Sequence, residues 1–491
     1  MRKIINMFMF ISLSVIIFLS ALHIPVAAQE PDTPPTPQIH LNATAAILVE
    51  QSTGRVLFGY NEHERRYPAS MTKMLTALIV LDHFEPDEII IVGPEINNMP
   101  AGYATMAHTE GEAMTIRMLL KALMIRSGNE TGRVLAINVI RRTTGNANIS
   151  YEDAKRQFST LMNERAQELG VLDSHFNNPY GLHSPHHYTT AYDLALIAIA
   201  YMQVPLLAEI ASMLTFTGDG TEGQPVYGAT IRDFDWVNPN QTLPDAHFGH
   251  PHITGIKTGF TTPAGECLAG AATFGDISLI TIVFDSESPG RWHDTRRLMD
   301  YGFFSYSFRE VSREGQHIEN VRISNPRRGY HDILGVVAAE SYTALLSHAE
   351  YTNMTRVITY NSLLLPGRRA AAADDEEGEY ENEYELDDGL TVLIAPIEEG
   401  DVIGHVSYWI GEEMLFRSPI IAASTVMHQS FDSDMDYIIA QFTENIFTLR
   451  ALPYWLAIFG TVFGVVGVSW ALSLRRKVKE HDRWHNPKPR R

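Results

Sequence analysis

The most informative stretch of the sequence is Ser70-Met71-Thr72-Lys73, which places a lysine about one helical turn after a serine. Apolar residues recur at helical spacing over 71–81, so the pattern predicts a helix that begins near Ser70. Residues three apart share one face of a helix, which brings the Lys73 amine within reach of the Ser70 oxygen. A serine hydroxyl becomes a good nucleophile when a base takes its proton. The stretch therefore predicts a nucleophilic serine with its own base, although alone it also fits an exposed helix start.

Two further short motifs follow along the chain. Ser127-Gly128-Asn129 lies between predicted helices at 114–125 and 131–141, where the serine can relay a proton and the amide can hold substrate or Lys73. Lys257-Thr258-Gly259 follows an extended stretch, and a lysine and a hydroxyl on a strand edge can bind a carboxylate. Each motif is common alone. Their order, with 54 residues from Lys73 to Ser127 and 130 from Ser127 to Lys257, makes the set specific.

The three motifs together resemble those of the D-alanyl-D-alanine carboxypeptidases, the serine-type low-molecular-mass penicillin-binding proteins. The Ser-Gly-Asn form of the middle motif is similar to the variant in that family. The similarity extends over about residues 40–305, and 395–404 is similar to the family's C-terminal β-domain. Six further stretches agree with the family: 46–50, 53–57, 67–70, 178–182, 189–195 and 264–268.

The resemblance implies an α+β fold of the serine β-lactamase and transpeptidase type. Helices would flank an antiparallel sheet, and a helical subdomain would carry Ser127. A small all-β domain would follow. The C-terminal transmembrane helix is predicted by the sequence itself and departs from the family, in which many members use an amphipathic helix that lies on the membrane. The sequence itself predicts strands at 44–50, 55–60, 277–285, around Leu268, and at 355–360, 391–394, 402–410 and 414–416.

The resemblance also implies catalytic roles for three residues. Ser70 would form an acyl-enzyme, Lys73 would accept its proton, and Ser127 would pass the proton onward. Backbone N–H groups of Ser70 and Phe260 would form the oxyanion hole. Water would then release the shortened peptide after the terminal D-alanine of a peptidoglycan stem pentapeptide has left. β-Lactams mimic the same bond and would trap Ser70.

A second group of residues would bind the substrate under the same resemblance: Asn129, Lys257, Thr258, Gly259, Phe260 and Arg291. Lys257 and Thr258 would hold the terminal carboxylate. Arg291 would add a second cation there, and a surface arginine is the alternative for this position. The reaction needs no metal and no other cofactor, so the histidines at 183–187 and 247–252 are expected not to be ligands. Cys267, the single cysteine, is expected to be buried.

Two other functions share these motifs. A class A serine β-lactamase would carry Glu-x-x-Leu-Asn between Asn129 and Lys257, and that stretch is absent. A penicillin-sensing or scaffold protein would be expected to continue into further membrane helices or a signalling domain, and 17 residues follow Leu474. The sequence favours the carboxypeptidase over both.

The two ends of the chain predict export and anchoring. Residues 1–28 predict a signal peptide, because a basic start precedes an apolar stretch and small residues, and an uncleaved anchor is the alternative. Residues 452–474 carry no charge and can cross a hydrocarbon core of about 30 Å as a helix. The basic tail 475–491 predicts a cytoplasmic C-terminus, and hence a catalytic domain on the extracytoplasmic face of a bacterial cell membrane.

Between these ends the 491 residues have room for two or three domains. The sequence predicts a Pro-rich spacer at 29–42, a catalytic domain at 43–307, a β-rich domain at 310–427 with an acidic insert at 374–388, and a linker at 428–451. The net charge is −20, and no basic patch precedes the tail, which argues against a nucleic-acid partner. The oligomeric state is left open.

Overall fold

The computed structural model describes residues 39–97, 99, 105–324, 326–327, 329–361, 364, 392–428, 435, 439 and 452–485. The predicted signal peptide, the acidic insert and most of the spacer and linker lie outside these residues. Contacts divide the chain into two compact units. Unit 1 runs to Arg309 and also includes Ala344–Thr352, a segment that the sequence analysis placed in the β-rich domain. Within unit 1, Arg55 donates to the Leu345 carbonyl, which ties this segment to the first hairpin.

Unit 1 is built on a five-stranded sheet in the order β2-β1-β9-β8-β7, and every neighbouring pair is antiparallel. The strands are β1 (Ala45–Glu50), β2 (Val56–Tyr60), β7 (Ile253–Thr261), β8 (Gly265–Phe274) and β9 (Ile277–Ser286). This arrangement confirms the expected antiparallel sheet. The candidate substrate-binding motif Lys257-Thr258-Gly259 lies on β7, which is an edge strand of this sheet.

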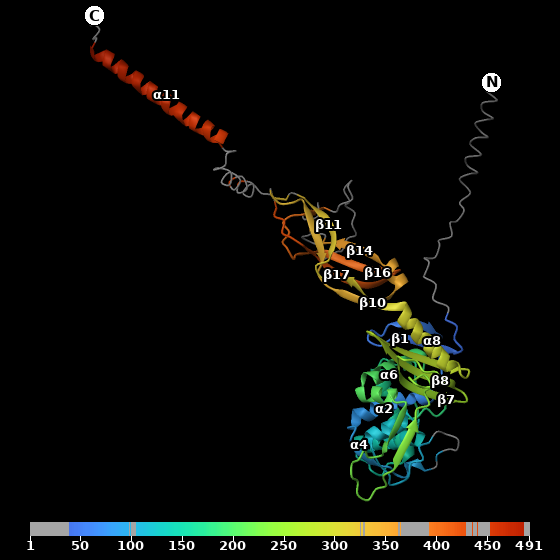
Figure 1. Cartoon of the computed structure of the whole chain (residues 1–491). Helices are drawn as coiled ribbons and strands as arrows, with labels where there is room; N and C mark the ends of the chain where they lie inside the picture. The colour runs from blue at the N-terminus through green and yellow to red at the C-terminus, as the bar shows by residue number, and fades with distance from the viewer. Residues whose placement is uncertain are drawn as a thin grey trace, which may run out of the picture. The chain divides into compact units, whose positions relative to one another are not determined.

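Helices cover both faces of this sheet (Figure 1). All six residues of β1 are buried, and successive side chains point to opposite faces. Ile47 packs in the core formed with α2 (Lys73–His83) and α6 (Ala191–Gln203), whereas Leu48 packs with Leu298 of α8 (Gly290–Ser305). The unbroken apolar run from Ala45 to Val49 therefore suits a strand that is covered by helices on both faces.

The helical subdomain contains α3 (Ile116–Met124), α4 (Asn129–Thr144) and α5 (Tyr151–Glu168), with the 3-10 turn η2 (Pro94–Ile96) against α4. The 3-10 turn η1 (Ala69–Thr72) and helix α7 (Pro205–Ser212) lie against strand β7 of the sheet. The prediction of a helix from 114 was wrong at its start. Ala113–Thr115 form strand β4 beside β3 (Ile89–Ile91), and α3 begins only where the Thr115 side chain accepts a hydrogen bond from the Met118 N–H.

Two short strand pairs remain, one within unit 1 and one where the chain leaves unit 1. β5 (Thr215–Asp219) pairs with β6 (Asp233–Val237), and β10 (Tyr306–Ser312) forms a two-stranded sheet with β13 (Tyr342–Ser347). The short helix α9 spans His348–Asn353.

Unit 2 contains a six-stranded sheet in the order β14-β16-β17-β12-β11-β15. The strands are β11 (His317–Ser324), β12 (Ile333–Ala338), β14 (Thr355–Tyr360), β15 (Val392–Ile394), β16 (Val402–Ile410) and β17 (Glu413–Ala422). Buried and accessible residues alternate along β12, as expected for a sheet with one face on a core. The structure confirms a β-rich second domain.

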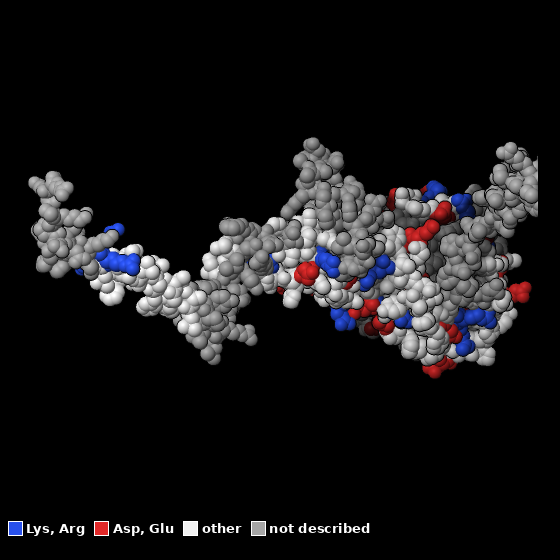
Figure 2. Space-filling model, turned by 90° about the horizontal axis from the view of Figure 1, so that it is seen from above, with Lys and Arg blue, Asp and Glu red and all other residues white. Residues whose placement is uncertain are grey.

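A long helix, α11 (Leu452–His485), contains the candidate membrane span Trp455–Lys477, with a mean hydropathy of 1.9. Figure 2 shows it as a rod of mostly uncharged side chains with Lys and Arg at one end. The bent pair α6 and α7 is together also long and apolar enough for a membrane span, but Ile197 and Leu207 are fully buried in the core of unit 1. Among the described residues, α11 is therefore the one candidate anchor.

Candidate active site

Ser70 and Lys73 meet where η1 runs directly into α2. The Lys73 Nζ lies 2.9 Å from the Ser70 Oγ, 2.7 Å from the Asn129 Oδ1 and 2.7 Å from the Tyr180 carbonyl oxygen. The last two oxygens can only accept hydrogen bonds. A neutral amine has two N–H groups for them, which leaves its lone pair directed at the Ser70 hydroxyl. The geometry therefore suits a lysine that takes a proton from Ser70.

The electrostatic setting of Lys73 favours this neutral form. Its side chain is fully buried, and burial is the main cause that places its pKa well below the usual value for lysine. The positive charge of Lys257 lowers the pKa further, and the negative charge of Glu130 opposes the change. A base at neutral pH needs such a lowered pKa.

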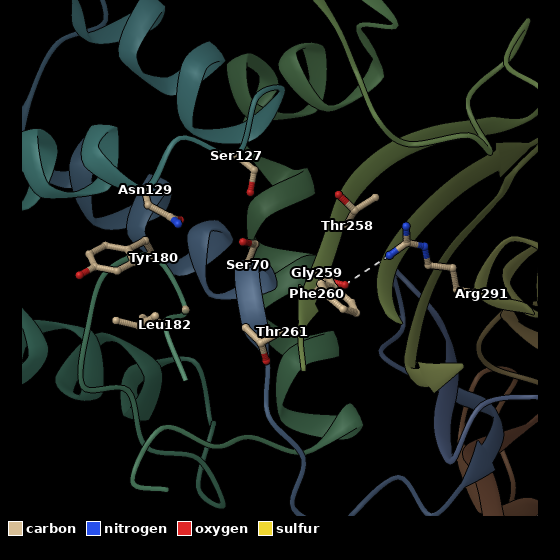
Figure 3. A pocket seen from close by; sticks show the side chains of 11 residues that line it. Ser70, Ser127, Asn129, Tyr180, Leu182, Thr258, Gly259, Phe260, Thr261 and Arg291 are labelled. Atoms are coloured by element: carbon tan, nitrogen blue, oxygen red, sulfur yellow. Dashed lines mark hydrogen bonds between the residues drawn. The ribbon is translucent and has the colours of Figure 1, made fainter. Parts of the chain in front are cut away.

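The Ser127 motif forms the opposite wall of the pocket. Ser127 adopts a left-handed backbone conformation with φ of 59°, so its side chain leaves the chain just before α4 begins at Asn129. Figure 3 shows the Ser127 hydroxyl pointing into the pocket toward Ser70. Gly128 is needed for close packing, since a Cβ there would lie 2.4 Å from the Thr131 Oγ1. The motif thus delivers a hydroxyl and an amide to the Ser70–Lys73 pair.

Lys257 lies on β7 with only 1% of its surface exposed. Its Nζ donates to the Thr258 carbonyl oxygen at 2.9 Å. Burial, followed by the positive charge of Arg291, lowers the pKa of Lys257 to about 7. Cys267 lies opposite Gly259 on β8 and is buried, as expected, and burial raises the pKa of its thiol to about 12.

Arg291 reaches the same edge of β7 from the start of α8. Its NH1 donates to the Gly259 carbonyl oxygen at 3.4 Å, and its Nε lies 3.4 Å from a Glu266 carboxylate oxygen. Its side chain is 14% exposed, so this residue is not a surface arginine. Burial lowers the pKa of the Arg291 guanidinium, but an arginine side chain keeps its proton at neutral pH, so Arg291 stays charged.

These elements enclose a pocket of about 270 Å³ (Figure 3). Lys73 and Lys257 lie buried behind its wall, and Phe260, 62% exposed, stands at its rim. The structure thus brings all nine sequence-predicted residues to one place. The pocket is lined by Ser70, Ser127, Asn129, Tyr180, Gly181, Leu182, Thr258, Gly259, Phe260, Thr261 and Arg291.

The segment 178–182 has a role that the sequence did not assign. The Asn178 Oδ1 accepts hydrogen bonds from the N–H groups of Gly181 and Leu182, and the Thr76 hydroxyl donates to the Pro179 carbonyl oxygen. These bonds fix the loop that presents the Tyr180 carbonyl to Lys73. This segment agrees with the family in sequence, and its Asn-Pro pair with a nearby glycine indicates a turn, but neither signal says which carbonyl the turn presents.

Comparisons with known proteins agree on one family. The profile for D-alanyl-D-alanine carboxypeptidases, peptidase S11, matches residues 28–288, and the profile for the C-terminal domain of penicillin-binding protein 5 matches residues 370–428. The chain is 26% identical over 411 residues to the D-alanyl-D-alanine carboxypeptidase DacF of Bacillus subtilis, covering 83% of this chain and 92% of that one. It is 30% identical over 304 residues to DacD of Escherichia coli, covering 60% and 71%.

A solved structure extends the similarity to the fold. The crystal structure of the D-alanyl-D-alanine carboxypeptidase DacD from Francisella tularensis superposes with a TM-score of 0.57 at 21% identity, and the match covers 82% of this chain and 97% of that one. At this identity the match supports the fold alone.

Proposed function

The chain belongs to the D-alanyl-D-alanine carboxypeptidase family, peptidase S11, and on this premise we propose how its own residues carry out the reaction. The protein is a serine-type D-Ala-D-Ala carboxypeptidase of the penicillin-binding protein 5 type, and it takes part in peptidoglycan processing. The family implies a peptidoglycan peptide as substrate and β-lactams as ligands.

In the proposed acylation step, the Ser70 Oγ attacks the carbonyl carbon between the two terminal D-alanines while Lys73 takes its proton. The N–H groups of Ser70 and Phe260 stabilise the oxyanion of the tetrahedral intermediate. Ser127 passes a proton to the leaving D-alanine nitrogen, and the peptide remains as an ester on Ser70. Water then opens the ester, with Lys73 again as base. The observation that carries this proposal is the Lys73 Nζ held 2.9 Å from the Ser70 Oγ by two carbonyl acceptors.

We assign recognition of the terminal carboxylate to the cations at the β7 edge. Lys257 and Arg291 supply positive charge and Thr258 supplies a hydroxyl, beside the pocket that Ser70 lines. Asn129 holds Lys73 and faces the peptide, and Gly259 lets the substrate backbone lie along the strand. Since Arg291 is permanently charged, the pH dependence of this site comes from Lys257.

The function is tested by following D-alanine release from a pentapeptide that ends in D-Ala-D-Ala, with the full chain in detergent. Nitrocefin hydrolysis and labelling by a fluorescent penicillin are measured beside it. A carboxypeptidase releases D-alanine with turnover and turns over nitrocefin slowly. Fast nitrocefin hydrolysis without D-alanine release would indicate a β-lactamase, and labelling without either turnover would indicate a sensor or scaffold.

The lowered pKa of Lys257 predicts a pH-dependent KM. Below about pH 7 Lys257 carries a proton and attracts the substrate carboxylate, and above that pH the free enzyme loses this charge. We expect the KM for the pentapeptide to rise by up to about 10-fold between pH 6.5 and 8.5, equivalent to about 1.4 kcal/mol. Arginine keeps its proton throughout this range. In Lys257→Arg the KM should stay flat with pH, and a flat wild-type KM would contradict the assignment.

We further propose a single-pass anchor at 452–474, with unit 1 on the extracytoplasmic face of a bacterial membrane, a cleaved signal peptide at 1–28 and the basic tail in the cytoplasm. The apolar helix α11 with Lys and Arg at its end supports this topology. A chain that ends at residue 451 should be recovered in the soluble fraction, while the full chain resists an alkaline wash of membranes. Recovery of the shortened chain in washed membranes would show that another segment anchors it.

A further inference from the structure

His187 is buried directly behind the turn that carries Ser70. Its Nε2 lies 2.8 Å from the Thr72 Oγ1, and its Nδ1 lies 3.0 Å from the Asn177 N–H nitrogen. Only 1% of its surface is exposed, and its ring packs edge-on against Phe176. It is one of the six histidines at 183–187 and 247–252 that were expected not to bind metal, and no role was predicted for it.

The hydrogen-bond partners determine the tautomer of His187. The Thr72 hydroxyl has one proton, and it donates this to the Ala69 carbonyl oxygen at 2.8 Å, which can only accept. The Thr72 oxygen therefore accepts from His187, and we assign the ring proton to Nε2. The Nδ1 is then free to accept from the Asn177 N–H, as its position requires. Burial is the main cause that lowers the pKa of His187 to about 3, so this neutral form persists across the physiological range.

The end of this chain of bonds is the peptide group between Ala69 and Ser70. Ala69 has a φ of 45°, a left-handed conformation that non-glycine residues rarely adopt. Gly181 packs against the same carbonyl, since a Cβ at that position would lie 1.7 Å from the Ala69 oxygen. A peptide group is planar and trans, so the direction of its carbonyl also sets the direction of the Ser70 N–H. Fixing the Ala69 oxygen therefore aims the Ser70 N–H.

We propose that Thr72 and His187 are positioning residues that hold the Ser70 N–H in place as an oxyanion-hole donor. This inference rests on the proposed function, in which Ser70 is the nucleophile. The two residues touch neither substrate nor the reacting atoms. Thr72 acts through the Ala69 carbonyl, and His187 acts by donating to Thr72, which keeps the Thr72 proton on the Ala69 side. The strained turn at Ala69 is thus held by hydrogen bonds through Thr72 and His187, two residues that lie 115 positions apart in sequence.

The decisive comparison is Thr72→Val against Thr72→Ser. Valine keeps the shape and removes the hydroxyl, whereas serine keeps the hydroxyl. Loss of one oxyanion donor costs about 10²–10³-fold in kcat. Because the N–H is misdirected rather than removed, we expect kcat for D-alanine release to fall by about 10²-fold in Thr72→Val with KM within about 2-fold, and to stay within about 3-fold of wild type in Thr72→Ser.

A second readout separates positioning from a general loss of structure. A peptide boronic acid forms a tetrahedral adduct with the serine, and one of its oxygens occupies the oxyanion position. Its affinity should fall in Thr72→Val in parallel with kcat, while the substrate KM is unchanged. The thermal midpoint of each variant is recorded to confirm a folded protein. A folded Thr72→Val enzyme with wild-type kcat and boronic acid affinity would overturn the proposal.

His187 provides an independent pair of variants. His187→Phe fills the same space without a donor, and His187→Gln offers an amide N–H at similar reach. We expect His187→Phe to lower kcat by about 10-fold and His187→Gln to restore most of it, with KM constant in both. A His187→Phe enzyme with wild-type kcat would remove His187 from the chain of bonds. If wild type itself releases no D-alanine, the proposed function fails instead, and the two failures are therefore distinguishable.

Discussion

Ser70→Ala should lose D-alanine release by about 10⁴-fold or more, because no other hydroxyl occupies the nucleophile position beside Lys73 in the described pocket. Labelling by a fluorescent penicillin should disappear at the same time, since both reactions form an ester on the same oxygen. The fold should be unaffected: the Ser70 side chain faces the pocket, and its loss creates no cavity in the core. The measurements are the initial rate of D-alanine release, gel fluorescence after labelling, and the thermal midpoint.

The matched control is Ser212→Ala. Ser212 is an exposed serine at the end of α7, and its hydroxyl bonds only to the Glu209 carbonyl oxygen of its own helix. This variant should release D-alanine and take up label as wild type does. If Ser70→Ala still took up label at the wild-type rate, the nucleophile would have to be another residue.

Lys73→Met should slow acylation by on the order of 10²–10⁴-fold, the contribution typical of a positioned base. Methionine keeps most of the side-chain length and volume, so Ser70 stays in place without a proton acceptor. The Asn129 Oδ1 and the Tyr180 carbonyl oxygen each lose a donor, a cost of about 1–3 kcal/mol per group that removal of a buried amine partly offsets. The rate is measured as the time course of fluorescent penicillin incorporation at saturating concentration.

Lys121→Met is the matched control, because it removes a buried lysine that lies outside the pocket and so shows the effect of that loss on stability alone. Lys121 is also almost fully buried, and its Nζ lies 2.7 Å from a Glu222 carboxylate oxygen, away from the pocket residues. We expect a lower thermal midpoint and an unchanged acylation rate. Equal rate losses in Lys73→Met and Lys121→Met would mean that the amine of Lys73 has no catalytic part.

Much of the fold could be predicted because periodicity is a local property. β14 and β16 have the bounds that the sequence predicted, and β1 differs by one residue. Ile47 and Leu48 pack in different helical layers because successive side chains of a strand point to opposite faces of the sheet. The helix predicted at 131–141 spans Asn129–Thr144, and two further boundaries differ because of contacts with distant parts of the chain. Met114 fits a helical pattern but pairs with Ile90 in β4, and β17 runs on to Ala422 because Ser418 and Pro419 find partners in β16.

The parts of the site that consist of side chains could be predicted from the sequence, because the reaction requires particular residue types. The motifs at Ser70, Ser127 and Lys257 were identified from sequence and meet at one pocket. The backbone contributions were not predictable: the Tyr180 carbonyl that holds Lys73 has no side-chain signature. The bond between His187 and Thr72 was missed for a similar reason, because a pairing across 115 residues appears only once the chain is folded.

Ser70 as the acyl-forming nucleophile of a carboxypeptidase is tested most directly by trapping the acyl-enzyme and locating the modified residue. The full chain is incubated with benzylpenicillin and digested, and the peptides are mapped by mass spectrometry, while a portion of the same preparation is assayed for D-alanine release from the pentapeptide. We expect one penicilloyl ester on Ser70 and D-alanine release that stops as the adduct forms. An adduct on a different residue, or an adduct on Ser70 in a preparation that never released D-alanine, would contradict this assignment.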